Sequence, residues 1–196
     1  NDNWVKYVID IDQLEREPDV EAIISRKGKG YFWPGNVYLV SGYAGAMKSY
    51  LCLAIAASAV NRGTGADRTL QFFSLATKHR VLFGDTELAD NSIRRRTKAL
   101  RIMLGGYIDR DAFRYLSLRR VPGSIEDKLR VFDDACHGYK PDIIVIDSAR
   151  DLCYDFNDNR EADKLVGHLK QLASDLNAIV ISTSHKALGN GNAKGS

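Results

Sequence analysis

The sequence predicts an α/β fold in which a mostly parallel sheet is sandwiched between helices. Short apolar runs rich in β-branched and aromatic residues alternate along the chain with longer segments of helical periodicity. The runs lack polar alternation, which is typical of strands covered on both faces, and such strands are usually parallel. Strands and helices in alternation build a doubly wound sheet with right-handed crossovers. The four runs are residues 37–40, 81–83, 143–146 and 179–181, with 115–118 as a candidate further strand.

The predicted helices follow from the spacing of apolar residues. Residues 48–60 are apolar nearly all round, as in a helix that is packed on several sides. Residues 90–104 and 162–176 each carry an apolar stripe at three- and four-residue steps. Ser124, followed three residues later by Asp127, resembles a capping box and predicts the start of a further helix.

The composition is that of one folded, water-soluble domain. The 196 residues are 44% hydrophobic and 27% charged, which excludes a disordered or fibrous chain. No apolar stretch approaches the roughly 18 residues of a membrane-spanning helix, and no signal peptide is recognisable, so we expect a cytoplasmic protein without membrane contact. Three cysteines without metal-type spacing favour buried thiols in a reducing compartment. The formal net charge of +3 neither requires nor excludes a nucleic-acid partner.

The strongest motif follows the first predicted strand. Residues 42–49 match the G-x-x-x-x-G-K-[ST] phosphate loop in order, spacing and strand-loop-helix context. Backbone N–H groups of such a loop surround phosphate oxygens, and the helix N-terminus directs its partial positive charge at the same anion. We expect Lys48 to reach the outer phosphates and Ser49 to bind a Mg²⁺ ion that bridges them. The predicted nucleotide-binding residues are Gly42, Tyr43, Ala44, Gly45, Ala46, Met47, Lys48, Ser49 and Tyr50.

Met47 departs from the motif, because it stands at the position of the second glycine. A residue that opens a helix has an ordinary right-handed φ, so we expect a side chain to be tolerated there if it points away from the phosphates. The alternative interpretation of residues 42–49 is a Gly/Ala-rich turn that carries a Lys-Ser pair by chance.

Carboxylates follow two other predicted strands. Asp147 ends the run 143–146 at the carboxyl edge, where ligands of open α/β sheets collect, and is our candidate for the metal-side acid. Its alternative role is a turn or helix cap. Glu87, just past the run 81–83, is our candidate for positioning the attacking water, with Asp85 in reserve. Glu87 is also explained as an exposed first-turn residue favoured by the dipole of the next helix.

Two further features carry hypotheses with a structural alternative. His185 follows the last predicted strand, where a hydrogen bond to the γ-phosphate would report the nucleotide state; its alternative role is structural. A basic run occupies the polar faces of the helix at 90–104, and its commonest role is a solvated helix surface rather than a phosphate contact or a subunit interface. The run comprises Arg94, Arg95, Arg96, Lys98 and Arg101.

Together, four motifs resemble the RecA-like branch of phosphate-loop ATPases, in particular the RepA/DnaB-type helicase ATPases of plasmids, phages and mobile elements. They are residues 42–49, Asp85-Thr86-Glu87, residues 142–147 and Ser184-His185-Lys186. The resemblance implies, in that order, the phosphate loop, the catalytic Glu87, the magnesium-side Asp147 and a γ-phosphate sensor. It also implies that the five strands, numbered along the chain, lie in the order 3-2-4-5-1, with further strands beyond the first.

The resemblance further implies Mg-dependent ATP hydrolysis coupled to DNA binding or unwinding. Family members form rings, often hexamers, and residues 148–160 and 187–196 would face single-stranded DNA. We expect a lead-in segment at 1–36, an ATPase core at 37–186 and a flexible loop or truncated end at 187–196, all from a longer protein. The alternative function is a regulatory ATP-binding switch that acts on a protein partner. A small-molecule kinase is a third possibility, but no acceptor pocket or lid is recognisable.

Overall fold

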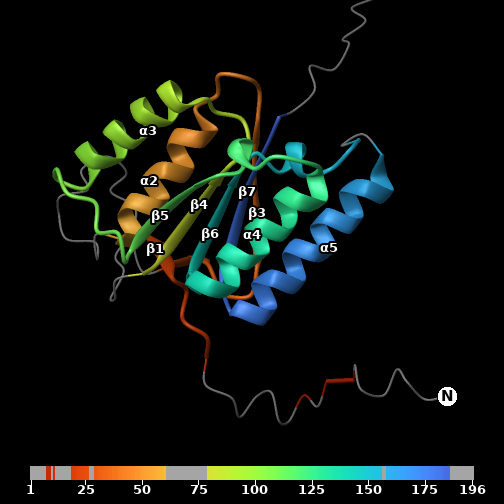
Figure 1. Cartoon of the computed structure of the whole chain (residues 1–196). Coiled ribbons are helices and arrows are strands. Elements are labelled where there is room, and N and C mark those ends of the chain that lie inside the picture. The colour runs from red at the N-terminus through yellow and green to blue at the C-terminus, as the bar shows by residue number, and fades with distance from the viewer. Residues whose placement is uncertain are drawn as a thin grey trace, which may run out of the picture.

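The protein contains a five-stranded parallel sheet with two helices on each face (Figure 1). The computed structural model describes residues 8–9, 11, 19–26, 29–60, 79–155 and 158–185. The strands run in the order β3-β7-β6-β4-β5, and every neighbouring pair is parallel. Their bounds are Val37–Gly42 for β3, Val81–Asp85 for β4, Phe113–Ser117 for β5, Ile143–Asp147 for β6 and Ile179–His185 for β7. The predicted fold class and the order of these five strands are confirmed.

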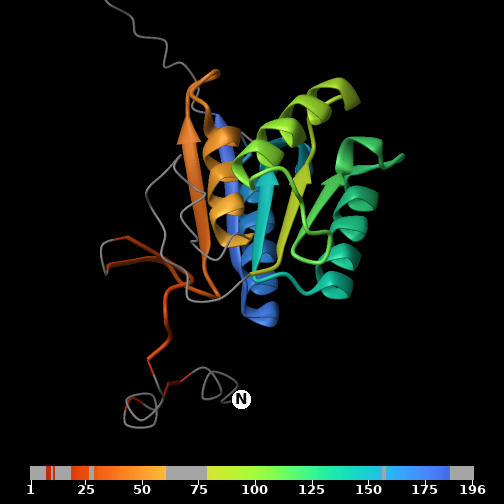
Figure 2. The ribbon, with the colours of Figure 1, turned by 90° about the vertical axis from the view of Figure 1, so that its left-hand side faces the viewer.

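Helices α2 and α3 cover one face of the sheet (Figure 2). In α2, Lys48–Val60, every residue from Cys52 onward is buried, as the apolar sequence predicts. Helix α3, Asp90–Met103, turns Leu100 into the same core. A hairpin of β1 (Ile24–Arg26) and β2 (Lys29–Phe32) adds Ile24 to this core, so part of the expected lead-in segment packs on the domain.

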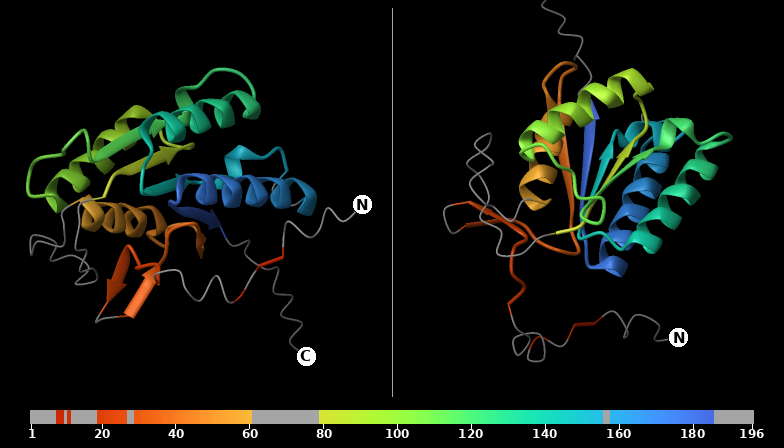
Figure 3. Two further views of the ribbon diagram at one scale, coloured as in Figure 1. Left: turned by 90° about the horizontal axis from the view of Figure 1, so that it is seen from below. Right: turned by 60° about the vertical axis from the view of Figure 1, so that its left-hand side comes forward.

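Helices α4 and α5 run side by side on the opposite face (Figure 3). Helix α4, Ile125–Tyr139, begins with the predicted capping box, in which the Ser124 hydroxyl accepts from the amide of Asp127 at 3.3 Å and the Ser124 amide donates to the Asp127 carboxylate at 2.9 Å. Helix α5, Asn159–Leu176, starts three residues before the predicted stripe, because Asp158 caps it. The short 3-10 helices η2, Leu118–Arg120, and η3, Ala149–Leu152, connect strands to helices.

One strand prediction is wrong in part. The sequence indicates that 37–40 is covered on both faces, but β3 is only half buried and the Leu39 side chain is 64% exposed. The physical reason is position: β3 lies at the edge of the sheet in the described part of the chain, where one side has no neighbouring strand. The predictions for 69–75, as an inserted strand or flap, and for 187–196 lie outside the described residues.

Candidate nucleotide-binding site

The carboxyl ends of the parallel strands bring distant parts of the sequence together. A pocket of about 200 Å³ opens there, between the loop after β3, the loop after β4 and the end of β6. Its lining residues are Gly45, Ala46, Met47, Lys48, Ser49, Tyr50, Glu87, Arg96 and Asp147. The structure therefore gathers most of the predicted phosphate-loop residues, the candidate catalytic Glu87 and the candidate metal-side Asp147 around one space.

The loop after β3 has the backbone of a phosphate cradle. Gly45 has a φ of 78°, a left-handed conformation that glycine adopts without steric cost. The amide of Ala46 donates to the carbonyl of Tyr43 at 3.1 Å, and that of Leu51 to the carbonyl of Met47 at 3.0 Å. The loop thus closes on itself and leads directly into the first turn of α2, and the N-terminus of a helix is a favourable position for an anion.

The expectation for Met47 is wrong. Its φ is 60°, in the left-handed region, rather than the right-handed value expected of a residue that opens a helix. Met47 lies directly before the first residue of α2, and glycine at this motif position would adopt the left-handed φ without steric cost. The Met47 side chain is 64% exposed, so the strain is confined to the backbone.

Lys48 lies across the loop with its charged end held by the backbone. Nζ donates to the carbonyl oxygen of Gly42 at 2.9 Å and to that of Tyr43 at 3.0 Å. The lysine is only 8% exposed. A Cβ on Gly42 would lie 3.7 Å from Lys48 Cδ and 3.4 Å from the Ala46 Cβ, at ordinary contact distance, so the Lys48 side chain passes close over position 42.

Asp147 is fixed at the end of β6 from two sides. Thr183 of β7 donates its hydroxyl to Asp147 Oδ1 at 2.7 Å, and Arg96 of α3 donates Nη1 to Oδ2 at 2.6 Å. The backbone around Asp147 is hydrogen-bonded to the residue that follows β4. The Thr86 amide donates to the Asp147 carbonyl, and the Ser148 amide donates to Thr86 Oγ1. Asp147 is therefore a preformed carboxylate at the pocket wall rather than a helix cap.

Asp85, the reserve candidate for the water-positioning group, has a structural position instead. It is completely buried and is not part of the pocket lining. Oδ1 accepts the amides of Glu87 and Leu88, and Oδ2 accepts Arg96 Nη1 and the Tyr115 hydroxyl. With both oxygens engaged twice, Asp85 anchors the turn that leads to Glu87.

Glu87 reaches the pocket on this turn. The Ser148 hydroxyl donates to Glu87 Oε1 at 2.9 Å, and Arg119 Nη1 donates to the Glu87 carbonyl at 2.6 Å. The residue is exposed, as a group that meets a substrate water must be. The contacts of Ser148 and Arg119 orient Glu87. The sequence does not predict them, because they join residues 61 and 32 positions apart.

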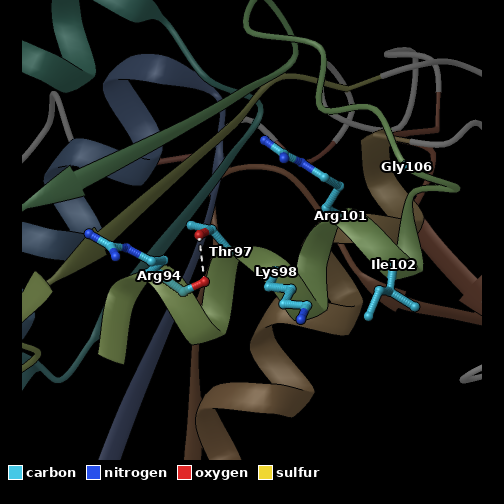
Figure 4. Close-up of a pocket in the computed structure, with 6 residues that line it drawn as sticks. All are labelled: Arg94, Thr97, Lys98, Arg101, Ile102 and Gly106. Atoms are coloured by element: carbon cyan, nitrogen blue, oxygen red, sulfur yellow. Dashed lines mark hydrogen bonds between the residues drawn. The ribbon is translucent and has the colours of Figure 1, made fainter. Parts of the chain in front are cut away.

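The basic run on α3 divides into two faces. Arg94, Lys98 and Arg101 line an open hollow of about 540 Å³ on the outer side of α3, where their cationic ends point away from one another (Figure 4). This face agrees with the expected solvated surface. Arg96 instead turns inward, with its side chain 12% exposed.

Arg96 is the site residue that the sequence reasoning missed. A signal was present: Arg96 lies three residues after Ile93 and four before Leu100, on the same stripe that faces the core. Burial opposes its charge, but Asp147, Tyr115 and Asp85 outweigh this effect and raise the pKa of the guanidinium above its usual value. Burial, with the nearby Asp147, also raises the pKa of the Cys52 thiol to about 12.

His185 is placed by its backbone. It ends β7 directly opposite Gly42 in the ladder, beside the start of the phosphate loop. Two residues earlier in β7, the Thr183 hydroxyl donates to Asp147. The role of His185 as a sensor stays a prediction.

The residues present fit a magnesium-nucleotide ligand. In the described part of the chain no group of three or more His, Cys, Asp or Glu side chains could hold a metal ion. A single carboxylate, Asp147, and the Ser49 hydroxyl at the same pocket suit Mg²⁺, which is commonly held by one or two carboxylates together with substrate phosphates and water. The pocket is smaller than the roughly 300–1,000 Å³ of sites that enclose a whole small ligand. It suits the phosphates and metal rather than an entire nucleotide.

Fold and site together define a phosphate-loop ATPase domain of the RecA-like type. The chain belongs to the AAA domain family AAA_25, which matches residues 8–190. A search of curated proteins gives no significant match. Among solved structures, it is similar to the KaiC-like protein PH0186 from the hyperthermophilic archaeon Pyrococcus horikoshii OT3. That match has a TM-score of 0.57 and 14% identity, and covers 87% of this chain and 72% of that one. At this identity the likeness shows the fold alone.

No helix in the described ranges is long and apolar enough to cross a membrane.

Proposed function

We propose that this domain hydrolyses ATP with the help of Mg²⁺. The observation that carries the proposal is the single pocket lined by the phosphate loop, Lys48, Ser49, Glu87 and Asp147. These residues come from three separate strand ends, and their convergence supports a phosphoryl-transfer site over a fortuitous Gly/Ala-rich turn.

Each residue has a role that follows from its position. Loop amides and Lys48 bind the phosphates, and Lys48 exchanges the carbonyls of Gly42 and Tyr43 for phosphate oxygens. Ser49 and Asp147 would hold Mg²⁺, which supplies neutralisation of phosphate charge in the transition state. Glu87, oriented by Ser148, accepts a proton from the attacking water while the water oxygen bonds to the γ-phosphorus. The bond between the γ-phosphorus and the oxygen that bridges it to the β-phosphate breaks, and ADP and inorganic phosphate leave.

We further propose that the ATPase acts on DNA as a RepA/DnaB-type helicase that assembles into a ring such as a hexamer. The support for this finer step is the resemblance of the four motifs and the strand order 3-2-4-5-1, in which the loops after β6 and β7 share one edge of the sheet. A regulatory ATP-binding switch would use the same pocket with slow turnover and no response to DNA.

The proposal is tested by phosphate release measured with and without single-stranded DNA, together with light scattering for ring formation. Glu87→Gln should retain binding of a fluorescent ATP analogue and lose turnover by at least about 100-fold, since general-base catalysis contributes about 10²–10⁴. Lys48→Ala should lose nucleotide binding. Glu161→Gln and Lys98→Ala, both outside the pocket, are the matched controls and should behave as wild type.

Absence of nucleotide binding in the wild-type protein would overturn the ATPase proposal. Turnover that is unchanged by Glu87→Gln would reject the role of Glu87. A rate that single-stranded DNA leaves unchanged would reject the helicase step and favour the regulatory switch.

A further inference from the structure

One nitrogen atom of Arg96 bridges two acidic side chains at the edge of the sheet. Nη1 lies 2.9 Å from Asp85 Oδ2 and 2.6 Å from Asp147 Oδ2. The side chains of all three residues are nearly out of contact with solvent, at 12%, 0% and 8% exposure. Away from solvent an ion pair is weakly screened, so each buried charge is stabilised mainly by its oppositely charged partners.

The two carboxylates differ in how much they depend on Arg96. Asp85 has Tyr115 and two backbone amides as further donors. Among the residues that the structure describes, Asp147 has one further side-chain donor, the Thr183 hydroxyl at Oδ1, and Oδ2 is engaged by Arg96. Asp147 also lines the pocket, whereas Asp85 does not.

The Arg96 guanidinium therefore contacts Asp147, the carboxylate that would bind the metal. Lys48 is the other cation of the pocket, and its Nζ is directed at the loop carbonyls. A divalent cation that approaches Asp147 without phosphates meets the positive charge of Arg96 at Oδ2. A cation that arrives with a triphosphate brings compensating negative charge and further oxygen ligands.

We propose that Arg96 is a positioning residue that occupies Asp147 in the nucleotide-free site, so that a divalent cation binds there only together with nucleotide phosphates. Asp85 is its anchor: because Arg96 shares one nitrogen between two acids, it keeps Asp85 as acceptor when Asp147 turns to the metal. The inference deepens the proposed function and rests on it for the identity of the metal-bound ligand.

The test is Mn²⁺ binding in the absence of nucleotide, followed by the electron paramagnetic resonance signal of free Mn²⁺. Arg96→Gln should bind Mn²⁺ at least tenfold more tightly than wild type, because the competing charge is gone. Arg95→Gln is the matched control, since it removes the same charge from the adjacent, exposed position of α3. Equal Mn²⁺ affinity in Arg96→Gln, Arg95→Gln and wild type would overturn the proposal.

A second pair of variants keeps the test decisive if Arg96→Gln does not fold, as judged by circular dichroism. Asp85→Asn combined with Arg96→Gln removes one buried charge of each sign and leaves Asp147 uncovered, whereas Asp85→Asn alone leaves Arg96 on Asp147. The double variant should bind Mn²⁺ at least tenfold more tightly than the single variant. If the two bind equally, Arg96 does not compete with the cation.

Nucleotide binding is measured separately, with a fluorescent ATP analogue in EDTA. Arg96→Gln, or the double variant in its place, should bind within about threefold of wild type, because neither Asp147 nor Arg96 is required for the loop amides and Lys48 to hold phosphates. A loss of more than tenfold would make Arg96 a phosphate ligand and overturn the proposal. A wild-type protein that binds no nucleotide would instead refute the ATPase function, while the Mn²⁺ comparison would still decide the role of Arg96.

Discussion

The two sides of the pocket are built in different ways. The loop side, residues 43–47, is exposed throughout and consists of backbone turns, with Lys48 folded onto two of its carbonyls. The acidic side, at the ends of β4 and β6, is buried, and its side chains are joined by short hydrogen bonds from Arg96, Tyr115 and Thr183. The acidic side is thus held by side chains of three other elements, whereas the loop side is exposed and is held by its own backbone.

This difference predicts that substitutions on the two sides of the pocket have unequal effects on the free energy of unfolding. Substitutions among the buried acids and their partners should reduce stability strongly. Substitutions in the loop should act mainly on nucleotide binding and should change the free energy of unfolding little.

The largest effect is expected for Arg96→Ala. Removal of the guanidinium leaves Asp85 and Asp147 as uncompensated buried carboxylates, and breaking a buried ion pair from one side costs about 3–5 kcal/mol. The free energy of unfolding is measured by urea denaturation in EDTA. Arg95→Ala, on the exposed side of the same turn, should stay within about 0.5 kcal/mol of wild type. Equal losses for the two variants would mean that the acidic side is not held by Arg96.

A smaller loss is expected for Tyr115→Phe. The Tyr115 hydroxyl donates to Asp85, and a hydrogen bond to a charged group contributes about 1.5–3 kcal/mol. Burial and this hydrogen bond raise the pKa of Tyr115, so the phenol stays protonated as a donor at neutral pH. Tyr107→Phe, at an exposed position, is the control for the same chemical change. A loss below about 0.5 kcal/mol in urea unfolding would show that the backbone amides alone satisfy Asp85.

The smallest effect, of opposite sign, is expected for Met47→Gly. A left-handed φ costs a residue with a side chain about 1–2 kcal/mol, and glycine at position 47 would remove this strain. The greater entropy of glycine in the unfolded chain would offset roughly 0.4–1 kcal/mol of the gain. We expect an increase of about 0.5–1 kcal/mol in the free energy of unfolding. Met47→Ala keeps the Cβ and should give no increase. If glycine lowers stability, the exposed Met47 side chain makes contacts that outweigh the strain.

Local patterns in the sequence predicted much of the fold and all the described residues that line the pocket except Arg96. The apolar runs, the capping box at Ser124 and the phosphate-loop spacing are each set by neighbouring residues. The contacts of Ser148 with Glu87 and of Thr183 with Asp147 join residues 61 and 36 positions apart, and no local pattern encodes them. The position of Arg96 on the apolar stripe between Ile93 and Leu100 indicates that its side chain faces the core. Its charge, however, favoured the prediction that it lies on a solvated helix surface.

By itself, the sequence determined the strand-loop-helix unit at 37–60, the alternation of strands and helices, and the carboxylates that end two strands, because propensity, periodicity and capping act over a few residues. Only the tertiary structure decided that Asp147 lines the pocket and that Asp85 lies behind it. Parallel pairing places Asp85 and Asp147 opposite one another, and α3 then lays Arg96 between them. Both acids are buried, but Asp147 lies at the pocket wall and Asp85 does not, a distinction that arises from packing rather than from residue type.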